Sequence, residues 1–171
     1  MLYCYSNQFT SEMRKIDALL NEYGESHQNG LNKAIHWICV PLIFFSIVGL
    51  IWSIPSGIIK STFPAMGNYA NWATVLLVFT LLYYARLSFP LFIGMLMVVA
   101  GFTFAANWID INMATPLWMV SLIIFVAAWI GQFYGHKVEG KKPSFLKDVQ
   151  FLMIGPAWLL HFIYKKLGIG Y

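Results

Sequence analysis

Four histidines carry most of the reactive chemistry in this sequence. They are His27, His36, His136 and His161, in a chain that is 59% hydrophobic and only 11% charged. Imidazole is the commonest neutral metal ligand in proteins and the side chain that most readily exchanges a proton near neutral pH. Because the chain offers few other polar groups, we expect these histidines to mark the functional site.

The spacing of three histidines allows a folded chain to bring them together. On one unbroken helix His27 and His36 would lie on opposite faces, but Asn29-Gly30 between them predicts a chain reversal. The reversal would let both rings face each other where an apolar run begins. His136 ends another apolar run, and Glu139 would share its helix face. The spacing therefore allows three imidazoles and one carboxylate to meet at one depth.

Such a ligand set resembles an oxygen-active iron site, in which ferrous iron keeps positions open for dioxygen and a substrate. Tyr23, Asn32 and Gln132 are residue types that could orient the ligands. The spacing equally allows histidines that only pack at a membrane interface. His161, on the C-terminal tail, is expected to pack or to line a pocket.

The composition predicts an integral membrane protein. A soluble domain could not cover its surface with 11% charged residues, and the mean hydropathy is +0.65. The net charge of +4 does not indicate nucleic-acid binding, because lysines and arginines cluster at the ends of apolar runs. Cys4 and Cys39 lie on a polar tail and in an apolar run, so no disulfide is expected.

We predict one all-α membrane domain over residues 1–171. It begins with an amphipathic helix over 9–28, whose apolar stripe runs from Phe9 to His27. Four transmembrane helices are predicted over 36–54, 70–85, 87–107 and 116–135. An interfacial or re-entrant segment over 145–165 follows, and a fifth crossing by this segment is the alternative.

Four crossings would place both termini on one side of the membrane. Ten of the eleven lysines and arginines fall on that side and only Lys60 on the other, which predicts cytoplasmic termini. The histidine site would then face the cytoplasm. The short chain without sorting tails favours a bacterial inner membrane over the endoplasmic reticulum.

Two motifs around these histidines resemble the signatures of the 2-hydroxy fatty acid dioxygenase family, formerly a domain of unknown function. Its best-known members act in fungal phytosphingosine breakdown. The first motif is Tyr23-x3-His27-x4-Asn32-x3-His36, followed by Val40-Pro41. The second is Gln132-Phe133-x-Gly135-His136, followed by Glu139 and Pro143, and the tail from Pro156 to Gly168 gives a third, weaker match. The resemblance covers nearly the whole chain.

The resemblance implies an iron(II)-dependent, membrane-bound oxidoreductase that carries out fatty acid α-oxidation. A 2-hydroxy fatty acid and dioxygen would give a product one carbon shorter. His27, His36 and His136 match family histidines and would bind iron together with Glu139, while the acyl tail would run between apolar helices. The candidates for substrate binding are Tyr23, Asn32, Gln132, Lys137 and His161.

Two other functions remain open. The first alternative is a haem protein in which two of the histidines are axial ligands. The second is a non-enzymatic membrane scaffold or lipid-binding protein whose histidines only pack. A Soret band would indicate the first, and the absence of any bound transition metal would indicate the second.

Overall fold

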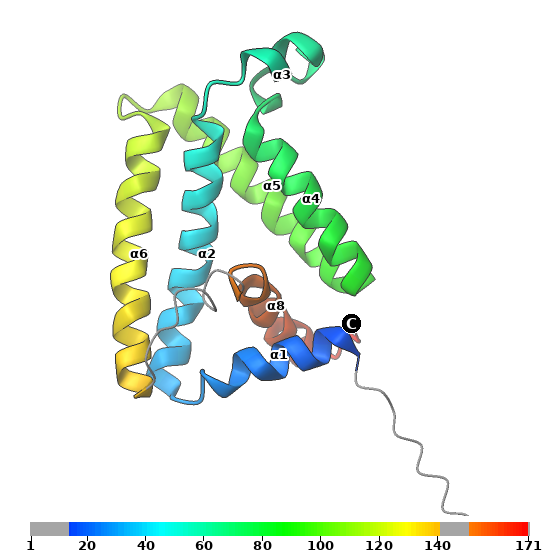
Figure 1. Cartoon of the computed structure of the whole chain (residues 1–171), viewed down its shortest axis with the longest axis vertical. Helices are drawn as coiled ribbons and strands as arrows, with labels where there is room; N and C mark the ends of the chain where they lie inside the picture. The colour runs from blue at the N-terminus through cyan, green and yellow to red at the C-terminus, as the bar shows by residue number, and fades with distance from the viewer. Residues whose placement is uncertain (1–13, 141–150, 171) are drawn as a thin grey trace, which may run out of the picture.

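The described part of the chain, residues 14–140 and 151–170 of a computed structural model, folds into helices joined by turns (Figure 1). Three helices are long and apolar enough to cross a membrane: α2 (Gly30–Trp52), α5 (Phe89–Asn112) and α6 (Leu117–Glu139). The chain is therefore an all-α membrane protein, as the composition predicts.

The prediction of four full crossings holds only in part. The second predicted span corresponds to α4 (Trp72–Leu87), which is apolar but has only 16 residues. A helix of that length reaches about 24 Å, whereas a bilayer's hydrocarbon core is about 30 Å thick. The short helices α3 (Gly57–Thr62) and η1 (Pro64–Tyr69) connect α2 to α4, and α4 turns into α5 at Ser88.

Asn29 sets the turn between α1 (Lys15–Glu25) and α2. Its side-chain oxygen accepts hydrogen bonds from the backbone N–H groups of Leu31 and Asn32, which have no partner within the helix. The sequence indicates a helix end at Asn29-Gly30, but α1 already ends at Glu25 and Asn29 caps the following helix. As a result α2 begins six residues before His36.

The apolar stripe of α1 packs against α8 (Ile154–Leu167). Ile16, Leu20 and Tyr23 are buried, as the helical spacing predicts. Phe9 and the predicted helix start, as well as residues 145–150 of the predicted C-terminal segment, lie outside the described residues. Figure 1 shows α1 leading away from the lower end of α2 at a steep angle and passing beside α8, rather than running along α2 or α6.

Two tyrosines tie α8 to the pair of helices α4 and α5. Tyr84 donates a hydrogen bond to the backbone carbonyl of Met153, which lies just before α8. Tyr164 on α8 donates one to the carbonyl of Pro90, 2.6 Å away, at the start of α5. Both phenol groups thereby find partners at buried positions.

The most extensive helix contact joins α2 to α6, because glycines let the two backbones approach closely. A Cβ atom at Gly131 would lie 2.7 Å from Cys39 Sγ, and one at Gly135 would lie 2.5 Å from Asn32 Oδ1. The four-residue spacing puts both glycines on one face of α6, as in other membrane helix pairs. On α2, Gly49 makes the same kind of close approach to Ser121.

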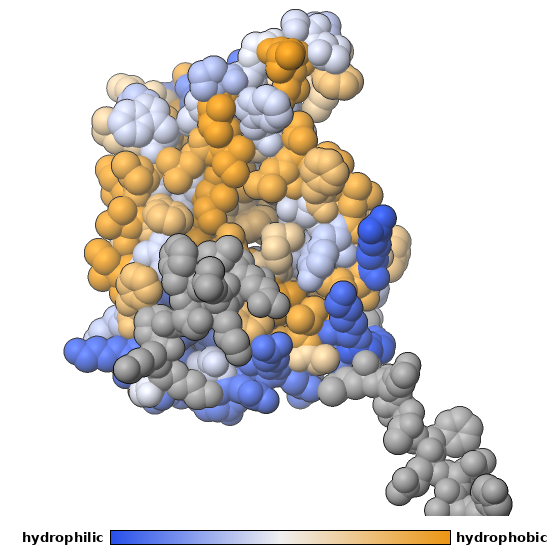
Figure 2. Space-filling model, in the orientation of Figure 1, coloured by the Kyte–Doolittle hydropathy of each residue, from blue (hydrophilic) through white to orange (hydrophobic). Residues whose placement is uncertain are grey.

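Large hydrophobic side chains cover the outside of the long helices and of α4. Phe79, Phe104, Ile123 and Ile130 are each more than 60% exposed. In Figure 2 the visible face over the long helices is largely hydrophobic, and hydrophilic residues gather toward the end where α1 lies. A surface of this kind matches a lipid environment rather than water.

Replacing Gly131 with Ala should destabilise the pair of helices α2 and α6. The added methyl group would force Cys39 or the α6 backbone to shift, and overpacking of this kind costs about 1–3 kcal/mol in the free energy of unfolding. Gly101→Ala on α5 is the matched control, because a Cβ at Gly101 meets nothing within 4 Å. Thermal unfolding in detergent measures the difference, and equal stability of the two variants would contradict the close approach.

Candidate metal centre

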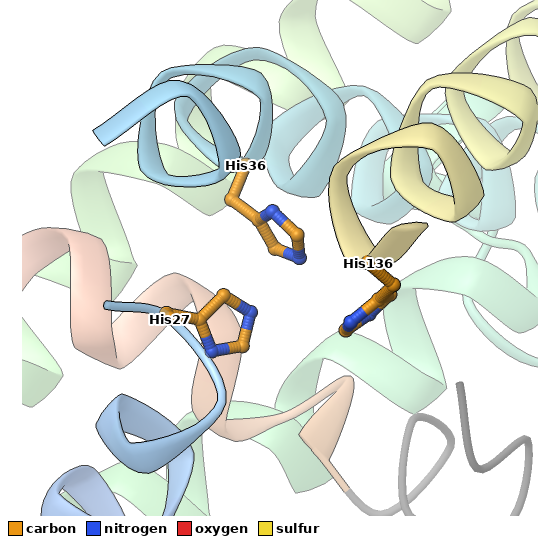
Figure 3. Close-up of side chains that lie close together, drawn as sticks. All are labelled: His27, His36 and His136. Carbon is orange, nitrogen blue, oxygen red and sulfur yellow. The ribbon is translucent and has the colours of Figure 1, made fainter. Parts of the chain in front are cut away.

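Three histidines from three segments of the chain point into one space (Figure 3). His27 lies in the turn between α1 and α2, His36 lies on α2, and His136 lies in the last turn of α6. Their ligand atoms all lie within 4.8 Å of one another. The side chains are 3%, 0% and 5% exposed, respectively. The structure therefore brings together three of the four ligands predicted from the sequence.

Backbone carbonyls fix the protonation of two of the rings. His27 Nδ1 lies 2.6 Å from the carbonyl oxygen of Tyr23, and His36 Nδ1 lies 2.9 Å from that of Asn32. A carbonyl can only accept, so in the neutral form of both rings the proton lies on Nδ1 and Nε2 keeps a lone pair. In each case the carbonyl belongs to the residue four positions earlier in the chain, so local geometry sets the ring orientation.

The Nε2 atoms of all three histidines are buried. Within residues 14–140 and 151–170, His36 Nε2 has no hydrogen-bond partner. A buried acceptor normally has a partner, and a metal ion bound between His36 Nε2 and the ligand atoms of the other two histidines would supply one. Three imidazole nitrogens suit iron, zinc, copper or nickel, and three protein ligands leave positions open for other molecules. The residues present therefore fit a transition metal.

Glu139, the fourth predicted ligand, is not brought into this group. One of its carboxylate oxygens accepts a hydrogen bond from the backbone N–H of Gln28 at 2.7 Å. The other accepts from the backbone N–H of Asn29 and from the side chain of Asn32, both at 2.9 Å. The carboxylate thus ties the end of α6 to the turn after His27 and to the start of α2, where helix amides lack partners and favour negative charge.

Two of the predicted substrate-binding residues support the histidine rings. Tyr23 stacks on His27, with ring centroids 4.2 Å apart and planes 12° from parallel. Asn32 is fully buried, and its side chain donates to Glu139 and to the carbonyl of Ser26. Its own carbonyl is the one that orients His36.

The other three substrate-binding candidates differ in burial and in the helix that carries them. Gln132 is buried one turn before His136, whereas Lys137 is exposed at the end of the same helix. His161 lies apart on α8, where it contacts Phe162 and lines a polar pocket of about 260 Å³ between α1 and α8. Burial, and then Lys165, lower the pKa of His161, which favours its neutral form.

Trp158 belongs to the site although its position in the sequence did not indicate this. Its ring centroid lies 5.3 Å from that of His27 and 5.2 Å from that of Tyr23, and its side chain is 3% exposed. The indole therefore covers the His27 side of the centre from α8. Only the motif match between Pro156 and Gly168 could have pointed to it, because helix periodicity does not predict how α8 docks.

Glu139→Gln should weaken metal binding without removing a ligand. The amide of glutamine cannot accept all three hydrogen bonds, so the contact between α6 and the turn that carries His27 becomes weaker. We expect metal affinity to fall about 10–100-fold and the free energy of unfolding to fall by about 1–2 kcal/mol. Asp110→Asn, an exposed carboxylate at the far end of α5, is the control.

Metal titration followed by elemental analysis distinguishes positioning from coordination. At saturating metal the Glu139→Gln protein should reach the wild-type stoichiometry, because its three imidazoles remain in place. A folded variant that binds no metal at any concentration would show that the carboxylate itself is a ligand.

Comparison with known proteins agrees with the histidine motifs. A family model described as 2-hydroxy-palmitic acid dioxygenase Mpo1-like matches residues 13–167, a range that contains all three histidines of the centre. Comparisons with curated proteins and with solved structures gave no match. The family that the sequence motifs predict is thereby confirmed. The chain belongs to the 2-hydroxy-palmitic acid dioxygenase Mpo1-like family.

Proposed function

We propose that this protein is an iron(II)-dependent dioxygenase that shortens 2-hydroxy fatty acids by one carbon. The observation that carries the proposal is the convergence of His27, His36 and His136, with buried Nε2 atoms, inside an apolar membrane protein. The family description supplies the substrate class and the type of reaction. His27, His36 and His136 are the proposed ligands.

The proposed reaction favours iron over zinc among the metals that three imidazoles could hold. Zinc has no redox chemistry, whereas ferrous iron in nitrogen ligation is typical of oxygen-using enzymes. Bound iron would supply open positions for dioxygen and for the hydroxyl and carboxylate oxygens of the substrate, as well as the electrons that activate oxygen. The overall change R-CH(OH)-COOH + O₂ → R-COOH + CO₂ + H₂O balances in atoms and breaks the C1–C2 bond.

The chain's own residues orient the ligands and keep the site dry. The carbonyls of Tyr23 and Asn32 hold the His27 and His36 rings with Nε2 facing inward. The Tyr23 and Trp158 rings cover His27 and exclude water from that side. Glu139 is a positioning residue in this proposal, because it holds the turn that carries His27 against α6.

We propose that two residues on α6 bind the polar head of the substrate. Gln132 is buried one turn before His136, and the buried Oε1 of its amide has no hydrogen-bond partner within the described ranges 14–140 and 151–170. A carbonyl oxygen at this place could accept a hydrogen bond from the substrate's hydroxyl group. Lys137, exposed beside His136, offers a positive charge to the approaching carboxylate.

We further propose that α4 crosses the membrane together with α5, which gives four crossings. Figure 1 shows both helices lying side by side, and α3 lies at the end opposite the histidines. Arg14, Lys15, Lys33 and Lys137 lie on the elements at the histidine end, and Lys60 lies on α3. The excess of positive charge favours the cytoplasm at the histidine end.

Replacing His27, His36 or His136 with Ala should abolish both iron binding and activity. Each change removes one of three ligands, so we expect iron content after anaerobic reconstitution to fall at least about tenfold. Oxygen uptake with 2-hydroxyhexadecanoate should disappear with it. His161→Ala is the control and should keep wild-type iron content, because His161 lies outside the cluster.

Other outcomes would contradict the ligand assignment or indicate one of the alternative functions. Iron at wild-type stoichiometry in all three single variants would overturn the ligand assignment. A Soret band in the purified protein would indicate haem, and a wild-type protein that binds no transition metal would indicate a scaffold.

A further inference from the structure

An apolar groove of about 290 Å³ lies between α2, α5 and α8. Trp37, Pro41 and Phe44 line it from α2, Gly101 is among its residues on α5, and Leu160 is among those on α8. None of the described residues that line it carries a charge. Its environment therefore suits a hydrocarbon chain and excludes a polar ligand.

The groove begins at the depth of the histidine cluster. Trp37 follows His36 directly, and Phe44 lies seven residues further along α2. At 1.5 Å per residue the α2 wall of the groove extends about 10 Å from the cluster toward the middle of the membrane. An acid whose head lies at the histidines would have its tail at this depth.

Aromatic side chains connect the cluster to the groove. Trp158 contacts His27 at 5.3 Å and Phe162 at 4.6 Å between ring centroids. Phe162 in turn contacts Trp37 at 6.4 Å, and Trp37 lines the groove. These packed rings therefore form a continuous aromatic boundary between the cluster and the groove.

We propose that this groove holds the acyl chain of the 2-hydroxy acid substrate. This inference rests on the proposed function. It identifies the groove as the part of the protein that determines which acyl chain lengths of the substrate are preferred. A long tail fills the groove and gains free energy for each methylene group that it buries, whereas a short tail leaves the groove empty. Its position beside the cluster favours the substrate over a bilayer lipid as the occupant.

Gly101 allows the groove to be filled without disturbing the fold. A Cβ at this position meets nothing within 4 Å, so the side chain of Gly101→Leu would extend into the groove. Ala100→Leu adds bulk to the neighbouring exposed position on the same helix, outside the groove, and is the control. Both variants should keep wild-type iron content.

Kinetics with acids of two lengths test the groove. Gly101→Leu should lower kcat/KM for 2-hydroxyhexadecanoate at least about tenfold and leave kcat/KM for 2-hydroxyhexanoate within about twofold. Ala100→Leu should change neither value. An unchanged chain-length preference in Gly101→Leu would overturn the proposal. If the wild-type protein oxidised no 2-hydroxy acid at all, the proposed function would fail instead.

Photolabelling gives a readout that needs no turnover. Iron-loaded protein under argon would be irradiated with 2-hydroxyhexadecanoate that carries a diazirine near its methyl end. We expect labelled peptides from α5 and α8, loss of label in Gly101→Leu, and competition by unlabelled 2-hydroxyhexadecanoate. Label that phospholipid vesicles compete away equally well would identify a bilayer lipid site and contradict the proposal.

Discussion

The hydrogen bonds that Glu139 accepts from the turn between α1 and α2 hold the candidate metal centre together. His27 lies in that turn, His36 follows on α2, and His136 shares α6 with Glu139. The carboxylate therefore joins the segments that carry all three rings. Together with the hydrogen bond that Asn32 donates to the carbonyl of Ser26, this link restricts the movement of His27 relative to the other two ligands.

The close approach of α2 and α6 is the second constraint on the centre. Gly135 precedes His136, and its lack of a side chain makes room for Asn32, which binds Glu139 and orients His36. The helix contact and the ligand geometry thus depend on the same few residues. A metal bound at the centre would in turn stabilise the helix pair, because it binds the folded arrangement only.

Much of this arrangement could be predicted from the sequence. The features that could not be predicted depend on contacts that no local sequence pattern specifies. The helix break at Asn29-Gly30 and the position of His136 at the end of an apolar run allowed the three histidines to meet, but spacing alone did not distinguish a metal site from packing. The role of Glu139 was not predictable, because a carboxylate three residues after a histidine can bind either a metal or backbone amides. The four-residue spacing of Gly131 and Gly135 was a usable signal for the α2–α6 contact. The position of Trp158 against His27 could not be predicted, since no local pattern specifies how α8 lies against α1.

In the proposed function, the membrane environment separates the polar head of the substrate from its apolar tail. Polar groups of the substrate would meet the buried rings at one end of the bundle, while its tail would lie among apolar helices. The central claim is that three imidazoles from distant segments bind one iron ion. X-ray absorption at the iron edge of the anaerobically reconstituted protein tests this directly. We expect three imidazole ligands per iron with no sulfur and no porphyrin, and a spectrum with fewer than three imidazoles, or with thiolate or porphyrin ligation, would contradict the claim.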